Sequence, residues 1–248
     1  MKNLLFVTRY SIAFAFMNAT VSIITGCNDS PQTLALSGDI IGSSVLYDID
    51  GNQIANDTGI TVSVEGENHT TTTNSLGQWD LVGLTTGTYN IDISKPGYGT
   101  RKILDFQFVG GGQADAGNVG LYQIPTYSVT KLSDTTINGN VILNGTLSSP
   151  LPTNLMVAYI TVFFDTTSSV SLDPKNYLTW SNINTIDTMF SEGVASLEKF
   201  GFNSGQTAYA IAYTSNISPM GYTDFATGNQ VFTGLNPTAS YVVSFKVP

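Results

Sequence analysis

Short stretches in which apolar and polar residues alternate recur along most of the chain. Ile60, Val62 and Val64 alternate with Thr61 and Ser63, which is the period of two that a half-buried β-strand shows. Further apolar stretches predict strands around residues 40–47, 79–84 and 89–93, and around residues 155–164, 207–213 and 230–232. Turn residues separate these stretches about every 8 to 12 positions, as in all-β sandwiches and barrels. The pattern therefore predicts an all-β protein.

Turn-forming residues lie at several of the predicted boundaries. Asn74 to Gly77 and Thr85 to Gly87 are predicted as turns in the first half of the chain. Asn138-Gly139 and Asn144-Gly145 carry the residue pair that favours tight β-hairpin turns. The segment from Ser191 to Phe200 has some helical character, and its structure is left open.

The first 26 residues follow a different pattern. Lys2 and Arg9 accompany no acidic residue, and they are followed by a short apolar run that contains Asn18 and Thr20. A cationic start, a short apolar core and small residues before a boundary are the parts of a secretory signal peptide. The alternative is a membrane-spanning helix, but such a helix needs roughly 20 predominantly apolar residues. Residues 1–26 are therefore predicted to be a cleaved signal peptide.

The only cysteine of the chain, Cys27, follows this segment directly. The residues from Ile24 to Cys27 (ITGC) resemble the bacterial lipobox. The resemblance implies that Cys27 is lipidated on sulfur, so that a lipid anchors the mature chain in a membrane. The alternatives are a stray thiol or half of an intermolecular disulfide. We expect an exported, lipid-anchored protein of the bacterial cell envelope, at the outer membrane, with residues 27–36 as lipidated cysteine and tether.

Composition narrows the choice of partners. The chain has 9 Lys and Arg residues against 18 Asp and Glu residues, a formal net charge of −9. Loss of Lys2 and Arg9 with the signal peptide would make the remaining chain still more acidic. Nucleic acid is not an expected partner, because binding to phosphates depends on basic patches.

The first half carries the spacing of a known module. Asp48 to Ile54, Gly59 to Val64, Thr73 to Tyr89 and Lys95 to Tyr98 match the pattern of the carboxypeptidase regulatory-like domain. The resemblance covers about residues 37–124 and implies a transthyretin-like β-sandwich, a module common in exported bacterial proteins. The inward register of Trp79 favours a core position over a sugar-stacking platform.

The second half, residues 125–248, is predicted to form another sandwich. Leu235, Pro237 and Tyr241 have the spacing of the E–F corner of fibronectin type III sandwiches, to which this segment is similar. The resemblance implies that the hydroxyl of Tyr241 bonds back to the corner backbone. The order of strands is left open, because a complete module would add another strand. The predicted fold class is all-β, two consecutive β-sandwich domains after a cleaved lipoprotein signal peptide.

Few residues of the chain suit catalysis. His69 is the only histidine, so the chain lacks the ligands for a zinc site and the base for a nucleophilic triad. The activity of the carboxypeptidases that give the regulatory-like domain its name is therefore not expected here. Glu65 and Glu67 are expected on one strand face, where they would form a solvated pair more readily than the acid pair of a glycosidase. We predict no enzyme activity, no catalytic residue, no metal and no cofactor.

One segment resembles the start of a calcium loop. Asp48 to Asn52 (DIDGN) places oxygen ligands around Gly51, but the twelfth position of such a loop is Gly59 and not glutamate. A hairpin turn is the favoured interpretation, and calcium binding at these residues is left open.

The predicted function is a non-catalytic binding or interaction module at the cell surface, of the type found in Bacteroidetes lipoproteins. Its ligand would be a glycan or an envelope protein. Tyr177, Trp180 and Tyr222 are the candidates for an exposed aromatic contact surface, because aromatic rings in loops can stack on sugar rings; core filling is the alternative. A structural stalk or adhesin competes with this prediction, and a carbohydrate-active enzyme comes third.

Overall fold

The computed structural model describes residues 35–151, 157–194, 196–217 and 221–248. The described residues form strands, turns and one short 3-10 helix, η1 (Leu197–Phe200), which confirms the predicted all-β fold class. Cys27 and the predicted signal peptide lie outside the described residues. Within the described ranges, no helix has the length and apolar character needed to cross a bilayer.

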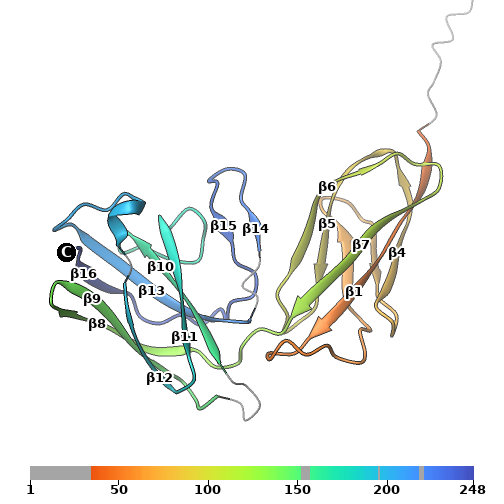
Figure 1. Cartoon of the computed structure of the whole chain (residues 1–248). Helices are drawn as coiled ribbons and strands as arrows, with labels where there is room; N and C mark the ends of the chain where they lie inside the picture. The colour runs from red at the N-terminus through yellow and green to blue at the C-terminus, as the bar shows by residue number, and fades with distance from the viewer. Residues whose placement is uncertain (1–34, 152–156, 195, 218–220) are drawn as a thin grey trace, which may run out of the picture. The chain divides into compact units, whose positions relative to one another are not determined.

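The first half forms two sheets (Figure 1). One sheet has the order β4 (Gln78–Thr85), β1 (Ser37–Tyr47), β7 (Gln113–Tyr122). The other has the order β3 (Thr70–Thr72), β2 (Thr61–Val64), β5 (Gly87–Ser94), β6 (Arg101–Phe108). β1 and β7 run parallel, from the pair Asp39 and Gln113 to the pair Tyr47 and Tyr122.

The core of this half follows the alternation seen in the sequence. Ile60, Val62 and Val64 are buried, as the period of two predicts. The prediction that Trp79 lies in the core is confirmed, because its side chain is only 4% exposed and its indole N–H donates to Ser44 Oγ at 3.2 Å. The remaining buried side chains of this core come from both sheets: Ile40, Leu46, Leu81, Leu84, Tyr89, Ile91, Ile93, Phe108 and Leu121.

The turn from Asn74 to Gly77 is confirmed. Asn74 Oδ1 accepts hydrogen bonds from the backbone N–H groups of Leu76 and Gln78, at 2.9 and 3.0 Å. Gly77 has a φ of 75°, and a Cβ there would lie 2.1 Å from the carbonyl oxygen of Ser44. The turn therefore depends on glycine for both its conformation and its contact with β1.

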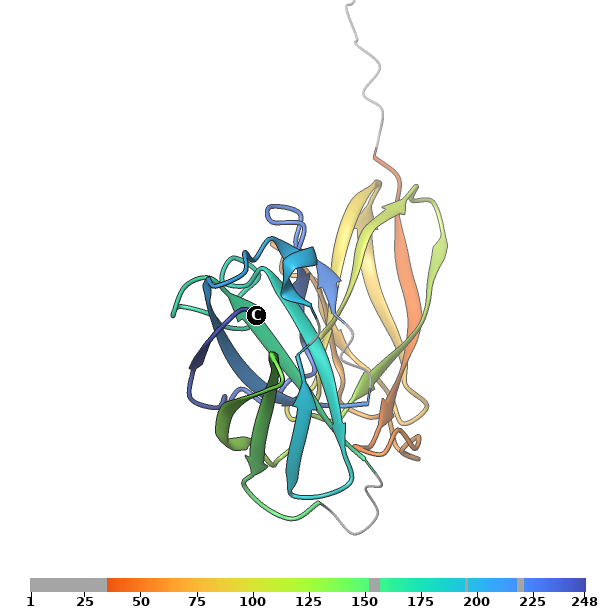
Figure 2. The same ribbon diagram turned by 60° about the vertical axis from the view of Figure 1, so that its left-hand side comes forward.

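The second half contains two larger sheets and a hairpin. One sheet has the order β11 (Thr179–Thr185), β10 (Ala158–Asp165), β13 (Thr207–Ser215), β16 (Val243–Lys246). The other has the order β12 (Met189–Gly193), β9 (Asn140–Leu147), β8 (Val129–Ile137). The hairpin consists of β14 (Tyr222–Thr223) and β15 (Gln230–Val231), and its tip lies at the top of the second half in Figure 1 and Figure 2. The boundaries predicted for the two domains, residues 37–124 and 125–248, stay a prediction.

β10 is buried on both of its faces. Ile160, Val162 and Phe164 point into the core between the two larger sheets, whereas Phe163 points to the opposite, outer face. This double burial explains why the sequence around β10 is a continuous apolar run instead of an alternating one. The outer face of the sheet β11-β10-β13-β16 is therefore covered by a further layer of side chains, from the β14–β15 hairpin and the neighbouring loops.

One of the two predicted Asn-Gly hairpin turns is wrong. Asn138 and Gly139 do connect β8 to β9 in a turn, with φ values of 51° and 79°. Gly145, in contrast, lies inside β9, between its partners Leu132 and Phe190. A Cβ on Gly145 would lie 2.0 Å from Cζ of Phe190, so this glycine makes room for a ring and does not form a turn.

The predicted tyrosine corner does not form. Tyr241 is 82% exposed, so its hydroxyl does not bridge back to the corner backbone. The buried side chain of Asn236 ties this segment to the start of the second half, because its Nδ2 donates to the carbonyl oxygens of Pro125 and Tyr127, at 2.8 and 2.9 Å. The segment left open in the sequence, Ser191 to Phe200, contains the end of β12 and η1.

Candidate functional site

Five aromatic rings gather on the outer face of the sheet β11-β10-β13-β16. We call them the outer aromatic cluster: Phe163, Tyr177, Trp180, Tyr213 and Phe232. The ring of Phe163 lies at their centre, with centroid distances of 4.9 Å to Tyr177, 5.2 Å to Phe232 and 5.7 Å to Tyr213. Trp180 reaches the cluster through Phe232, at 5.0 Å. Tilted and edge-to-face pairs at these distances stabilise an aromatic cluster beyond the area they bury.

Strand register explains how the cluster forms. Phe163 on β10 is paired with Trp180 on β11 and with Ile211 on β13. Directly paired residues of antiparallel strands point to the same face, so these side chains share the outer face. Tyr177 comes from the connection between β10 and β11, and Phe232 directly follows β15.

Tyr177 is not exposed, which corrects the expectation for this residue. Its side chain is 3% exposed, since its ring fills the space between Phe163 and Phe232. Its hydroxyl donates to the carbonyl oxygen of Gln230 on β15, at 2.5 Å. Burial raises the pKa of the Tyr177 hydroxyl. Tyr177 therefore fixes the β14–β15 hairpin to the outer aromatic cluster.

Trp180 is accessible at the rim of the cluster. It is 37% exposed, and its ring plane makes an angle of 79° with that of Phe232. In such an edge-to-face contact, Phe232 covers at most one face of the indole. The other face of Trp180 is not covered by Phe232, and the ring is held in place by a buried neighbour.

Tyr222 lies on the hairpin and is half-buried. It is paired with Val231, the residue before Phe232. The structure therefore brings Tyr177 and Trp180 into one cluster and places Tyr222 on the strand pair next to it. Ligand contact by these three residues stays a prediction.

The hairpin is fixed to the rest of the site by Asn229. Its Nδ2 donates to the carbonyl oxygens of Pro174 and Tyr177, at 2.7 and 3.1 Å. At the hairpin tip, the carboxylate of Asp224 accepts hydrogen bonds from Thr227 Oγ1 and the Thr227 N–H, at 2.6 and 2.9 Å. These bonds hold the pKa of Asp224 below its usual range.

Sequence reasoning missed the centre of the cluster. Phe163 lay in a run of apolar residues that indicated a strand but not a strand with two buried faces. Phe232 and Asn229 lay in or next to a short predicted strand, around residues 230–232, with no motif that indicated a site. The unbroken apolar run around β10 is the signal from which cover on both faces could have been predicted.

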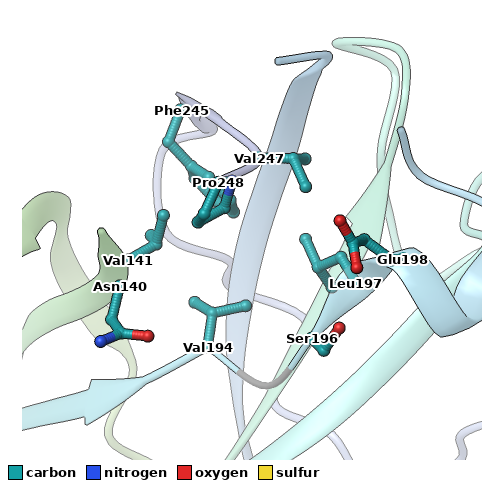
Figure 3. Close-up of a pocket in the computed structure, with 9 residues that line it drawn as sticks. All are labelled: Asn140, Val141, Val194, Ser196, Leu197, Glu198, Phe245, Val247 and Pro248. Atoms are coloured by element: carbon teal, nitrogen blue, oxygen red, sulfur yellow. The ribbon is translucent and has the colours of Figure 1, made fainter. Parts of the chain in front are cut away.

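A cavity opens at one end of the second half (Figure 3). It has a volume of about 220 Å³. Its walls are formed by Asn140, Val141, Val194, Ser196, Leu197, Glu198, Phe245, Val247 and Pro248. Ligand pockets usually measure about 300 to 1,000 Å³. Four of these wall residues belong to the core between the two larger sheets, so the cavity is an extension of that core and a weaker candidate than the outer aromatic cluster.

The acidic pair in the first half is arranged differently from the expectation. β2 ends at Val64, so Glu65 and Glu67 lie in the following turn and not on one strand face. Glu65 pairs with Lys102 at 2.7 Å, and this hydrogen bond holds the pKa of Glu65 below its usual value. Glu67 lies 3.8 Å from the imidazole of His69. The two acids therefore have separate partners.

The segment from Asp48 to Asn52 forms the predicted turn. Asp48 Oδ1 accepts the backbone N–H groups of Asp50 and Asn52, at 3.0 and 2.8 Å. This geometry is that of an Asx-type turn, in which the side chain replaces a backbone acceptor. In the described part of the chain, no three residues of the types His, Cys, Asp and Glu are grouped so that they could hold a metal ion.

Comparison with known proteins gives likenesses of limited extent. No curated protein matches the chain. A chain of a type II cohesin–X-dockerin complex from Acetivibrio cellulolyticus is 18% identical, with 35% of this chain and 58% of that chain covered and a TM-score of 0.30. A DUF3823 family protein from Parabacteroides merdae is 11% identical, with 86% of this chain and 100% of that chain covered and a TM-score of 0.31. The major pilin SpaD from Corynebacterium diphtheriae is 11% identical, with 85% of this chain and 65% of that chain covered and a TM-score of 0.30.

The chain spans less than two thirds of the cohesin complex chain and of the pilin. Because all three TM-scores are low, the site described above rests on the residues of this chain alone. The sequence profile of one family matches a part of the chain. It is the same family whose motif spacing the first half resembles. Residues 45–122 are similar to the carboxypeptidase regulatory-like domain.

Proposed function

We propose that the protein is a non-catalytic binding module, exported and anchored by lipid to the cell envelope, that contacts its ligand with the outer aromatic cluster. The observation that carries the proposal is Trp180, which is 37% exposed although it packs on a buried aromatic neighbour. An accessible aromatic ring on a rigid base is the kind of anchor that dominates binding surfaces.

Rigidity favours binding in this arrangement. Trp180 stands on a paired strand, with Phe163 directly opposite and Phe232 against its ring. Ordering a free side chain at an interface costs about 0.5–1.5 kcal/mol, and a side chain that is already held avoids most of this cost. The buried rings below Trp180 therefore support its role as a contact residue.

The anchoring part of the proposal rests on the sequence of residues 1–36. Lipid chains on Cys27 would contribute about 0.8 kcal/mol per buried methylene group, and two or more chains give stable attachment. Expression of the full chain with Cys27→Ser tests this part. We expect loss of partitioning into the detergent phase; unchanged partitioning and processing would exclude lipidation at Cys27.

The binding part is tested with a glycan array and with pull-down from crosslinked envelopes. The parent protein is compared with Trp180→Ala and with Phe200→Ala, a control that removes another half-exposed aromatic ring, on η1. We expect Trp180→Ala to lose the ligand and Phe200→Ala to keep it. Equal binding by all three proteins would refute a role for the outer aromatic cluster, and recovery of surface fibres or membrane assemblies by all three would favour a structural stalk or adhesin.

A further inference from the structure

β11 carries a row of exposed side chains beside the outer aromatic cluster. Trp180, Asn182 and Asn184 all point to the outer face, while Thr179 and Ile183 on the same strand are buried on the other. Successive side chains on one face of a strand are about 7 Å apart. The three residues therefore form a line of one indole and two amides, which we call the β11 strip.

The strip lies where a long ligand can reach it. β11 is the first strand in the order β11-β10-β13-β16, so only β10 borders it within its own sheet. On β10, the half-buried Tyr159 is paired with Asn184 and the buried Thr161 with Asn182. The strip is thus bordered by a second aromatic ring at the end opposite Trp180.

The two amides have hydrogen-bonding capacity left for a ligand. Asn182 Oδ1 accepts the hydroxyl of Thr161 at 3.1 Å, which holds the amide in place. The NH₂ group of Asn182 and the whole amide of Asn184 have no hydrogen-bond partner among the residues that the structure describes. An asparagine offers two donors and an acceptor, so the strip can both donate to and accept from hydroxyl groups.

The strip is also free of charge. Trp180, Asn182, Asn184 and Tyr159 carry no formal charge, although the chain as a whole has a net charge of −9. A cationic ligand would find no carboxylate on the strip and an anionic ligand no basic group, so a charged ligand would lose water without gaining a partner. An uncharged ligand with hydroxyl groups and an apolar ring face fits these side chains best.

We infer that the ligand is an uncharged sugar chain that lies along β11, stacked on Trp180 and hydrogen-bonded by Asn182 and Asn184. This inference rests on the proposed function and adds to it the class of ligand and its path. A sugar ring presents C–H groups on its face and hydroxyls on its rim, so the indole contacts the face and the amides contact the rim of neighbouring rings.

Affinity electrophoresis of the Cys27→Ser chain tests the inference. The gels contain one soluble polysaccharide each: uncharged glucans, xylans and mannans, and polygalacturonate as the charged comparison. A hydrogen bond contributes about 0.5–1.5 kcal/mol. We therefore expect Asn182→Ala and Asn184→Ala each to weaken binding of an uncharged polysaccharide about 2- to 10-fold, while Asn203→Ala, which removes an exposed amide in another loop, leaves it unchanged.

The outcomes separate the two proposals. If Trp180→Ala loses binding but both asparagine variants keep it, the proposed function stands and the path along β11 is refuted. If the parent binds only polygalacturonate, the ligand class is refuted. If the parent is retained by no polysaccharide, the ligand class is refuted, and the envelope pull-down with Trp180→Ala decides on the proposed function. Circular dichroism of each variant checks that it is folded.

Discussion

Gly145 provides a sharp test of the packing in the second half. Replacing it with alanine would place a Cβ 2.0 Å from Cζ of Phe190 and 2.3 Å from Cε1, well inside van der Waals contact. Phe190 is 6% exposed and belongs to the core between the two larger sheets, so the new methyl group would press on a packed ring. Overpacking of this kind costs about 1–3 kcal/mol. We expect Gly145→Ala to lower the free energy of unfolding by this amount.

The matched control is Gly193→Ala on the neighbouring strand β12. A Cβ on Gly193 would meet no atom within 4 Å, so this substitution should cost little or stabilise slightly through the unfolded chain. The double variant Gly145→Ala with Phe190→Leu should recover part of the loss, because a smaller side chain leaves space for the new methyl group. Directly contacting residues show coupling of about 0.5–3 kcal/mol in such cycles.

Urea unfolding followed by circular dichroism measures five proteins: the parent, Gly145→Ala, Phe190→Leu, the double variant and Gly193→Ala. Slopes of about 1–3 kcal/mol per molar urea make a loss of this size visible as a clear shift of the midpoint. If Gly145→Ala is as stable as Gly193→Ala, the ring does not occupy the space above Gly145. If Phe190→Leu does not recover stability in the double variant, the cost of Gly145→Ala arises from the backbone, as a turn at Asn144-Gly145 would require. The packing argument is then refuted.

Three further predictions concern other parts of the chain. Burial and the neighbouring Asp39 raise the pKa of Asp80, so its carboxyl group favours the folded state most when it is protonated, and this contribution is lost as the pH rises. Asp80→Asn should therefore raise the melting temperature more at pH 7 than at pH 3.5. An equal shift at the two pH values would contradict this argument. Asn229→Ala removes two hydrogen bonds, so amides of the β14–β15 hairpin should exchange on the order of tenfold faster; unchanged exchange would show that other contacts hold the hairpin. Trp79 is buried and Trp180 is accessible, so acrylamide should quench the fluorescence of the parent strongly and that of Trp180→Phe weakly.

The sequence predicted the first half of the fold better than the second. In the first half, β2 and β5 each have one buried face, so alternation such as that of Ile60, Val62 and Val64 reports burial directly. In β10, both faces are buried, and alternation disappears together with the information on which side chain faces outward. Phe163 and the cluster around it could therefore not be assigned from the pattern alone.

Short motifs were less reliable than periodicity, for a physical reason. An Asn-Gly pair is favoured in tight turns, but glycine is also used where a neighbouring ring needs space, as at Gly145. The spacing of Leu235, Pro237 and Tyr241 occurs without a tyrosine corner, because the side chain of Asn236 ties down this segment. Trp180 was found because it is an aromatic residue in a polar setting, whereas Tyr177 has a similar setting in sequence and is buried by a segment more than 50 residues away.

The parallel pairing of β1 with β7 has a mechanical consequence. A chain held by its N-terminal end enters this half at Ser37, the start of β1, and leaves it after Tyr122, the end of β7. In a parallel pair, these two points lie at opposite ends, so tension between them slides the strands past each other and loads all the bonds from Asp39–Gln113 to Tyr47–Tyr122 together. An antiparallel pair loaded at one end would open one bond after another. The β1–β7 ladder would therefore oppose a force that separates Ser37 from Tyr122 with all of its bonds at once.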